Sequence, residues 1–314
     1  MSNKYQEIEQ YQKFTAPAEV HKAVNSLIGM LKGIRFDEQL NNYELSEVLN
    51  WCNLHRKFQN KFPFSEIIPM IDTALEDEIL TPEEIEDILW LCENVVHHDG
   101  FNTYYDIVTS SLQQLHGVIH GIMADNQINE KEINMLFNWM NNHDFLNGFY
   151  PFDEIYSLIV SIKQDGVISN DEINMLKAYL GNFIDTRTSY NINESEIKSL
   201  QEEYTVSGIC MVSPNISFEG MTFSFTGKSS RAKRNEIANI IIGFGGIFNN
   251  NVTQNTNFLI VGDEGNPCWA FSCYGRKVEK AIDLRKKGHS IILVHENDFW
   301  QEHDNYFNRE KSEQ

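Results

Sequence analysis

The strongest candidate for phosphate chemistry is the segment MTFSFTGKSSRAKR at 221–234, where an apolar stretch runs into a glycine, a lysine and two serines. A nucleotide-binding P-loop needs a glycine five residues before its second glycine, because the loop between them surrounds the phosphate with backbone amides. The residue at that spacing before Gly227 is Thr222, and Gly220 is two positions out of register. The segment is therefore not a P-loop.

Two histidine groups are the candidates for zinc. His116 and His120 stand one helical turn apart, as zinc ligands on a helix often do, but no third ligand follows at a suitable spacing. The other group is HHD at 97–99. We expect surface or core histidines in both groups, and no bound metal.

Four acidic segments, DEQLNNYEL, DEILTPEEI, DNQINEKEI and DGVISNDEI, are similar to the second half of a calcium-binding EF-hand loop. If Gly166 is the sixth position of such a loop, the first and third positions fall on Ser161 and Lys163. A lysine cannot ligate a hard cation, so calcium binding is excluded on the donor set. We expect no cofactor.

A capping box explains the same four segments. Each has a small polar residue three positions before a glutamate, the spacing at which the two side chains cap each other's backbone amides at a helix start. The aspartate four residues before the cap is expected to form a turn. The predicted boxes pair Asn41 with Glu44, Thr81 with Glu84, Asn129 with Glu132 and Ser169 with Glu172.

The first two-thirds of the chain contain a long internal repeat. LIGMLKGIRFDEQLNNYELSEVLNW and LHGVIHGIMADNQINEKEINMLFNW are offset by 88 residues, and the offset aligns Gly29 with Gly117 and Gly33 with Gly121. The repeat predicts an all-α domain at 1–185 built from a duplicated helical unit, with copies at about 24–96 and 112–184. Its short motifs resemble helical TerB-like domains.

Charge divides the chain into two parts. The net charge is −20 over 314 residues, yet 217–300 contain ten Lys and Arg against eight Asp and Glu. We therefore expect an acidic helical platform that engages an unknown protein partner, and nucleic-acid contact only in the C-terminal part. A linker is predicted at 186–215, with a short helix at 194–204, and a polar tail at 304–314.

Composition also bears on location. The N-terminus is polar and no apolar run is long enough to span a membrane. The five cysteines, Cys52, Cys92, Cys210, Cys268 and Cys273, are odd in number and form no C-x-x-C pair. This pattern favours reduced thiols and a cytoplasmic protein without membrane contact.

The C-terminal third alternates predicted strands and helices in the order β-α-β-β-α-β-α, typical of a small parallel-sheet α/β domain. FSFTG, GFGG, VTQNTNFLIVG, KVEKA and ENDFW follow one another between 223 and 300. This order resembles the BRCT domain, most closely the single BRCT module of bacterial NAD-dependent DNA ligases, and sets the domain at 216–303. The N-terminal two-thirds of the chain does not resemble a ligase.

The resemblance implies a phosphate pocket formed by Thr226, Gly227 and Lys277. A hydroxyl, a backbone amide without a Cβ and an ammonium would then surround one anion. A Thr-Gly pair can also simply form a turn, so this alternative stays open. A possible nucleic-acid rim, equally compatible with a solvated basic surface, consists of Arg231, Lys233, Arg234 and Arg276. Trp269 and Tyr274 would either stack on a base or cover the core.

The expected function follows from the resemblance. It implies a non-enzymatic bacterial or phage protein of DNA repair or replication, without catalytic residues, that binds phosphorylated DNA ends or nicks. The alternative is a protein–protein adaptor whose BRCT domain binds a phosphopeptide or packs intramolecularly. Phosphopeptide-binding BRCT modules usually occur in tandem, and the chain contains one.

Overall fold

The computed structural model describes residues 2–36, 41–77, 79–97, 105–184, 186, 189–204, 210–211, 214–229, 231–262 and 276–312. Side chains are described for these residues except 2–17, 97, 276, 279 and 308–312. The chain forms two compact units, the first containing Met1–Phe145 and Lys177–Ser199 and the second Leu146–Leu176 and Leu200–Gln314.

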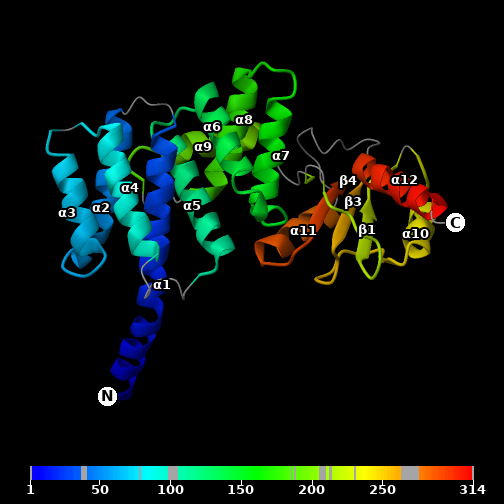
Figure 1. Ribbon diagram of the computed structural model, residues 1–314, viewed down its shortest axis with the longest axis horizontal. Coiled ribbons are helices and arrows are strands. Elements are labelled where there is room, and N and C mark those ends of the chain that lie inside the picture. Colours follow the sequence, from blue (N-terminus) through cyan, green and yellow to red (C-terminus); the bar gives the residue numbers. More distant parts are fainter. Residues whose placement is uncertain are drawn as a thin grey trace. The chain divides into compact units, whose positions relative to one another are not determined.

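The helical part follows the predicted repeat. Its elements are α1 (Ser2–Ile34), α2 (Asn42–His55), η1 (Arg56–Phe58), α3 (Phe64–Ala74), α4 (Pro82–His97), α5 (Ile107–Ile122), α6 (Glu130–Asn141), η2 (Asp144–Leu146), α7 (Phe152–Ile162), α8 (Asn170–Leu180), η3 (Gly181–Phe183) and α9 (Glu194–Glu203) (Figure 1). The predicted helix at 194–204 is therefore present as α9.

Glycines bring the first helices of the two copies into contact. A Cβ on Gly29 would lie 2.0 Å from the Gln114 carbonyl oxygen, and one on Gly33 would lie 2.4 Å from that of Val118. Only glycine permits this approach of two backbones. Because Gly29 meets Gly117 and Gly33 meets Gly121, α1 and α5 run side by side in the same direction.

All four predicted capping boxes are present. Asn41 and Asn129 accept from the amides of Glu44 and Glu132, and those glutamates accept in return from the cap amides. The same reciprocal bonds join Thr81 to Glu84 and Ser169 to Glu172. The preceding turns are formed as expected by the carboxylates of Asp77, Asp125 and Asp165, which accept from the amides two residues on. Asp37 lies outside the described residues.

The second unit contains a four-stranded parallel sheet in the order β2-β1-β3-β4. Its elements are β1 (Thr222–Thr226), α10 (Arg234–Gly243), β2 (Ile247–Phe248), β3 (Phe258–Val261), α11 (Arg276–Lys286), β4 (Ile292–His295) and α12 (Glu296–Ser312). This is the predicted order of strands and helices. Gly245, at φ +78°, follows the end of α10, in the conformation in which helices commonly end on a glycine.

The sheet is buried on both faces, as parallel sheets are. Phe258 and Ile260 of β3 point into a core with Phe223, Ile237 of α10 and Trp300 of α12. The intervening Leu259 and Val261 pack on the other face with residues of α11, among them Val278 and Ala281. These two cores fix the carboxyl ends of β1, β3 and β4 at one edge.

The boundaries expected at 185 and 216 do not coincide with the two compact units, because α7 packs in one unit with the α/β elements. Arg285 of α11 lies between the carboxylates of Asp153 and Glu154 at the start of α7. All three side chains are almost fully buried. The Nε atom of Arg285 lies 2.7 Å from Oε1 of Glu154, and its Nη2 lies 3.1 Å from Oδ2 of Asp153.

The cysteines differ from expectation at one position. Cys52 and Cys92 are buried free thiols, but Cys210 is disulfide-bonded. The prediction of five reduced thiols was therefore wrong for Cys210, because sequence spacing does not reveal which distant cysteines the fold brings together. Among the described residues, no helix combines the length and apolar character needed to cross a membrane.

Candidate phosphate-binding site

The candidate site begins where β1 ends. Thr226 is the last residue of the strand and is nearly buried, and Gly227 follows at φ +80°, a conformation that favours glycine. The Gly262 amide after β3 donates to the Thr226 carbonyl at 2.9 Å. A Cβ on Gly262 would lie 2.2 Å from the Lys228 carbonyl oxygen, so this edge of the sheet depends on the absence of a side chain there.

Lys277, in the first turn of α11, reaches the same strand end. Its Nζ donates to the carbonyl oxygen of Phe225 at 2.9 Å, one residue before Thr226. Burial lowers the pKa of Lys277, and the positive charge of Arg234 lowers it further. Among the described residues this is the one hydrogen bond seen for the ammonium, which has three hydrogens to donate.

Arg234 brings a second cation to this region from the start of α10. Its guanidinium lies 5.4 Å from the centre of the Phe225 ring, which holds it beside β1. Lys277 and Arg234 are like charges that affect one another, and no acidic partner of either is seen among the described residues. The helix N-terminus adds the positive end of its dipole. An anion placed here would relieve the repulsion between the two cations.

The other predicted rim residues are arranged differently. Arg231 pairs with Asp304 of α12 at 2.9 Å and lies over the Trp300 ring, so its charge is already compensated. Lys233 is the N-cap residue of α10, and its amide is bound by Glu236. The side chain of Arg276, and the whole of Trp269 and Tyr274, lie outside the described part of the structure. Arg234 is thus the described rim residue that the fold brings to Lys277.

The histidines considered for zinc have other surroundings. His116 is exposed, and the centre of its ring lies 6.1 Å from that of Phe183. His120 Nε2 lies 3.0 Å from Oε2 of Glu47. In the described ranges no three His, Cys, Asp or Glu side chains lie close enough to hold a metal ion. HHD at 97–99 falls outside the described side chains.

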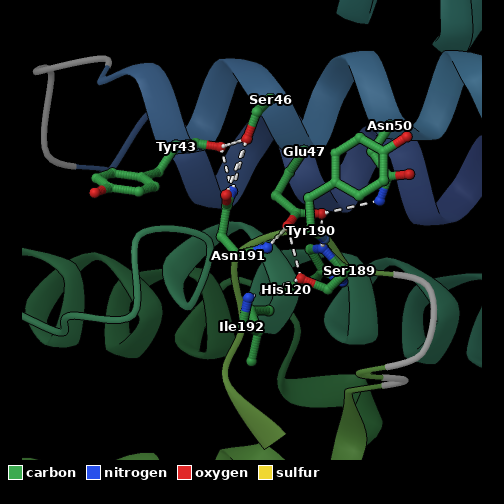
Figure 2. A network of polar contacts seen from close by, with 9 residues as sticks. All are labelled: Tyr43, Ser46, Glu47, Asn50, His120, Ser189, Tyr190, Asn191 and Ile192. Atoms are coloured by element: carbon green, nitrogen blue, oxygen red, sulfur yellow. Dashed lines mark hydrogen bonds and ion pairs between the residues drawn. The ribbon is translucent and has the colours of Figure 1, made fainter.

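Glu47 is the centre of a polar network that the sequence analysis did not identify (Figure 2). Its Oε1 accepts from the Ser189 hydroxyl at 2.6 Å and from the amides of Tyr190 and Asn191 at 2.8 and 2.9 Å. Burial alone would raise the pKa of Glu47, but these bonds and the one from His120 lower it to about 2. The network fastens the segment after the second copy onto α2.

A four-stranded parallel sheet with α10 and α12 on one face and α11 on the other, and with a basic edge at the carboxyl ends, defines a small α/β binding module. Residues 214–301 match the family model of the BRCA1 C Terminus (BRCT) domain. The C-terminal module is therefore a BRCT domain, and the match covers less than half of the chain. Searches of the curated proteins and of the solved structures found no significant match.

Arg285 was also missed by the sequence analysis. It appeared as one of several basic residues near the end of a predicted helix, with no signal that its side chain would be buried. Its partners lie more than a hundred positions away, at Asp153 and Glu154. The one available signal was that the repeat copies differ there, with Ser65 and Glu66 in the first copy and Asp153 and Glu154 in the second.

Proposed function

We propose that this protein is a non-enzymatic DNA repair or replication factor whose BRCT domain binds the 5′-phosphate of a DNA end or nick. Thr226, Gly227 and Lys277 would bind the phosphate, with Arg234 as a fourth group. The helical part would serve as a platform for a partner protein. The observation that carries the proposal is the pair of cations, Lys277 and Arg234, which both contact Phe225 of β1 two residues before the exposed Gly227.

Charge supports DNA as the ligand of this domain. The net charge of −20 lies in 1–216, whereas 217–300 carry a small positive excess. The acidic helical part repels a polyanion such as DNA, whereas the slightly basic BRCT domain does not. A single terminal phosphate provides the dianion that a compact group of donors can bind.

The test compares duplexes that differ only in a 5′-phosphate. Fluorescence anisotropy with the full chain is expected to show tighter binding of the phosphorylated end. Lys277→Ala should weaken binding of the phosphorylated duplex by at least about tenfold, or about 1.4 kcal/mol. Thr226→Val should weaken it by a smaller factor. Lys287→Ala removes the same charge beyond the far end of α11 and is the matched control. Equal binding of both duplexes, or equal effects of the two lysine variants, would refute the proposal.

A second candidate function is a protein–protein adaptor. It is favoured by the packing of α7 against Arg285, since this domain already uses one surface for a protein contact. Lys277 and Arg285 lie at opposite ends of α11, about 12 Å apart along its axis, so the phosphate site stays separate from that contact. Binding of a phosphoserine peptide in preference to both duplexes would select this function.

A further inference from the structure

The two copies of the helical unit differ in the turn after their second helix. The first copy reads HRKFQNKF at 55–62 and the second reads HDFLNGFY at 143–150. The aligned histidines keep the same role, because His55 and His143 each bond the carbonyl oxygen of the tryptophan four residues before. The positions of Lys57 and Lys61 are occupied by Phe145 and Phe149 in the second copy.

In the second copy this turn contacts a basic helix. The Gly148 carbonyl accepts from Arg285 at 3.4 Å, and Lys286 lies 5.9 Å from the centre of the Tyr150 ring. Asp153 and Glu154 complete the contact with buried negative charge. The turn and the start of α7 are therefore a surface to which a protein segment docks, and the acids of α7 match the basic residues of α11.

In the first copy the same turn borders a hollow of about 280 Å³. Its floor is aromatic, since the rings of His55 and Phe64 stack 5.2 Å apart and Phe58 stacks on Phe64 at 6.0 Å. Leu54, Phe58 and Phe62 also line it and are 46%, 39% and 48% exposed. Apolar side chains this open around a hollow indicate a binding surface.

The rim of this hollow is basic. Lys57 and Lys61 line it, and neither has an acidic partner among the described residues. Arg56 is different, because it forms two 2.8 Å bonds with Asp72. Burial lowers the pKa of His55, which favours the neutral form of its ring. Glu19 is the acid on the rim, so the local charge is positive.

We propose that this hollow binds an acidic peptide segment of a partner protein that inserts an aromatic or branched apolar side chain. The aligned turn of the second copy already contacts a protein segment, and the first copy carries Lys57 and Lys61 where the second copy has phenylalanines. The segment that matches this basic rim is therefore acidic. Nucleic acid fits less well, because the long polyanion would meet the net charge of −20 in 1–216. The inference rests on the proposed role of the helical part as a platform and is independent of the phosphate site.

The experiment selects short random peptides displayed on phage against the full chain, with the Lys57→Glu, Lys61→Glu double variant as counter-selection. Enriched peptides should contain acidic residues around an aromatic or branched apolar one. An enriched peptide, once synthesised, should bind the wild type and bind the double variant at least about tenfold more weakly. Its affinity for the Lys198→Glu variant should equal that for the wild type. Lys198 is an exposed lysine on α9 and serves as the matched control.

Several outcomes would overturn the inference. These are the absence of enrichment, enrichment of basic peptides, and equal binding by the double variant. Oligothymidylate binding that the double variant loses, without peptide enrichment, would mark a nucleic-acid site instead. Lys57→Ala with Lys61→Ala replaces the double variant if charge reversal prevents folding. Binding of 5′-phosphorylated duplex by the double variant reports separately on the BRCT domain and is expected to stay unchanged.

Discussion

The contact between Arg285 and α7 makes a sharp prediction for Arg285→Ala. The guanidinium is 1% exposed, lies 2.7 and 3.0 Å from the two oxygens of Glu154, and lies 3.1 Å from Asp153. Removing it leaves two buried carboxylates without their counter-ion. Breaking a buried ion pair in this way costs about 3–5 kcal/mol. We expect the free energy of opening of this unit to fall by that amount at pH 8.

The loss should also depend on pH. Burial raises the pKa of Glu154 and Asp153, and the charge of Arg285 opposes that rise in the wild type. Without Arg285 the folded carboxyls take up protons more readily than the unfolded ones, so stability falls as pH rises through their folded pKa. The deficit of Arg285→Ala should therefore be smaller at pH 5 than at pH 8.

Hydrogen exchange of the β4 amides, 292–295, measures this opening free energy directly. The matched control is Arg231→Ala, which breaks the half-exposed pair with Asp304 and should cost about 0–1 kcal/mol. The reasoning is refuted if Arg285→Ala costs no more than this control. It also fails if the cost is the same at both pH values, because the loss would then come from packing alone.

Three further predictions concern the helices. Glu47→Gln should flatten the acid side of the profile of unfolding free energy against pH. The lowering of the Glu47 pKa from 4.5 to about 2 stabilises the wild type by on the order of 3 kcal/mol above pH 4.5, and this stabilisation is lost as pH falls toward 2. Urea unfolding between pH 3 and 6 tests this, and parallel profiles for the two proteins would contradict it. Gly29→Ala should destabilise the protein by about 2 kcal/mol or more, because the new Cβ meets the Gln114 carbonyl. Gly243→Ala should stabilise it by about 0.5–1 kcal/mol, because nothing lies within 4 Å of the new Cβ. Thermal unfolding should therefore show midpoint shifts of opposite sign for the two variants. Ser169→Ala should cost about 1 kcal/mol through loss of the α8 cap, and unchanged amide exchange at 170–172 would argue against that role.

Local features of the sequence were enough to predict the secondary structure of much of this protein. Capping boxes involve residues three apart, so Asn41 with Glu44 and Ser169 with Glu172 were identified from spacing alone. The repeat predicted that α1 and α5 are equivalent helices, and the alternation of strands predicted the parallel sheet. These features are short-range or periodic, and such patterns are visible in one sequence.

The tertiary structure decided which distant residues meet. The sequence did not show that Arg285 would lie between Asp153 and Glu154, that Glu47 would bind the amides of Tyr190 and Asn191, or that Cys210 would be in a disulfide. The sequence showed several basic residues near Thr226. It did not show that Arg234 would lie near Lys277 while Arg231 would pair with Asp304. Pairings of this kind depend on how packed cores orient helices and strand ends, because burial selects among many charges of the same type, and that selection has no local sequence signature.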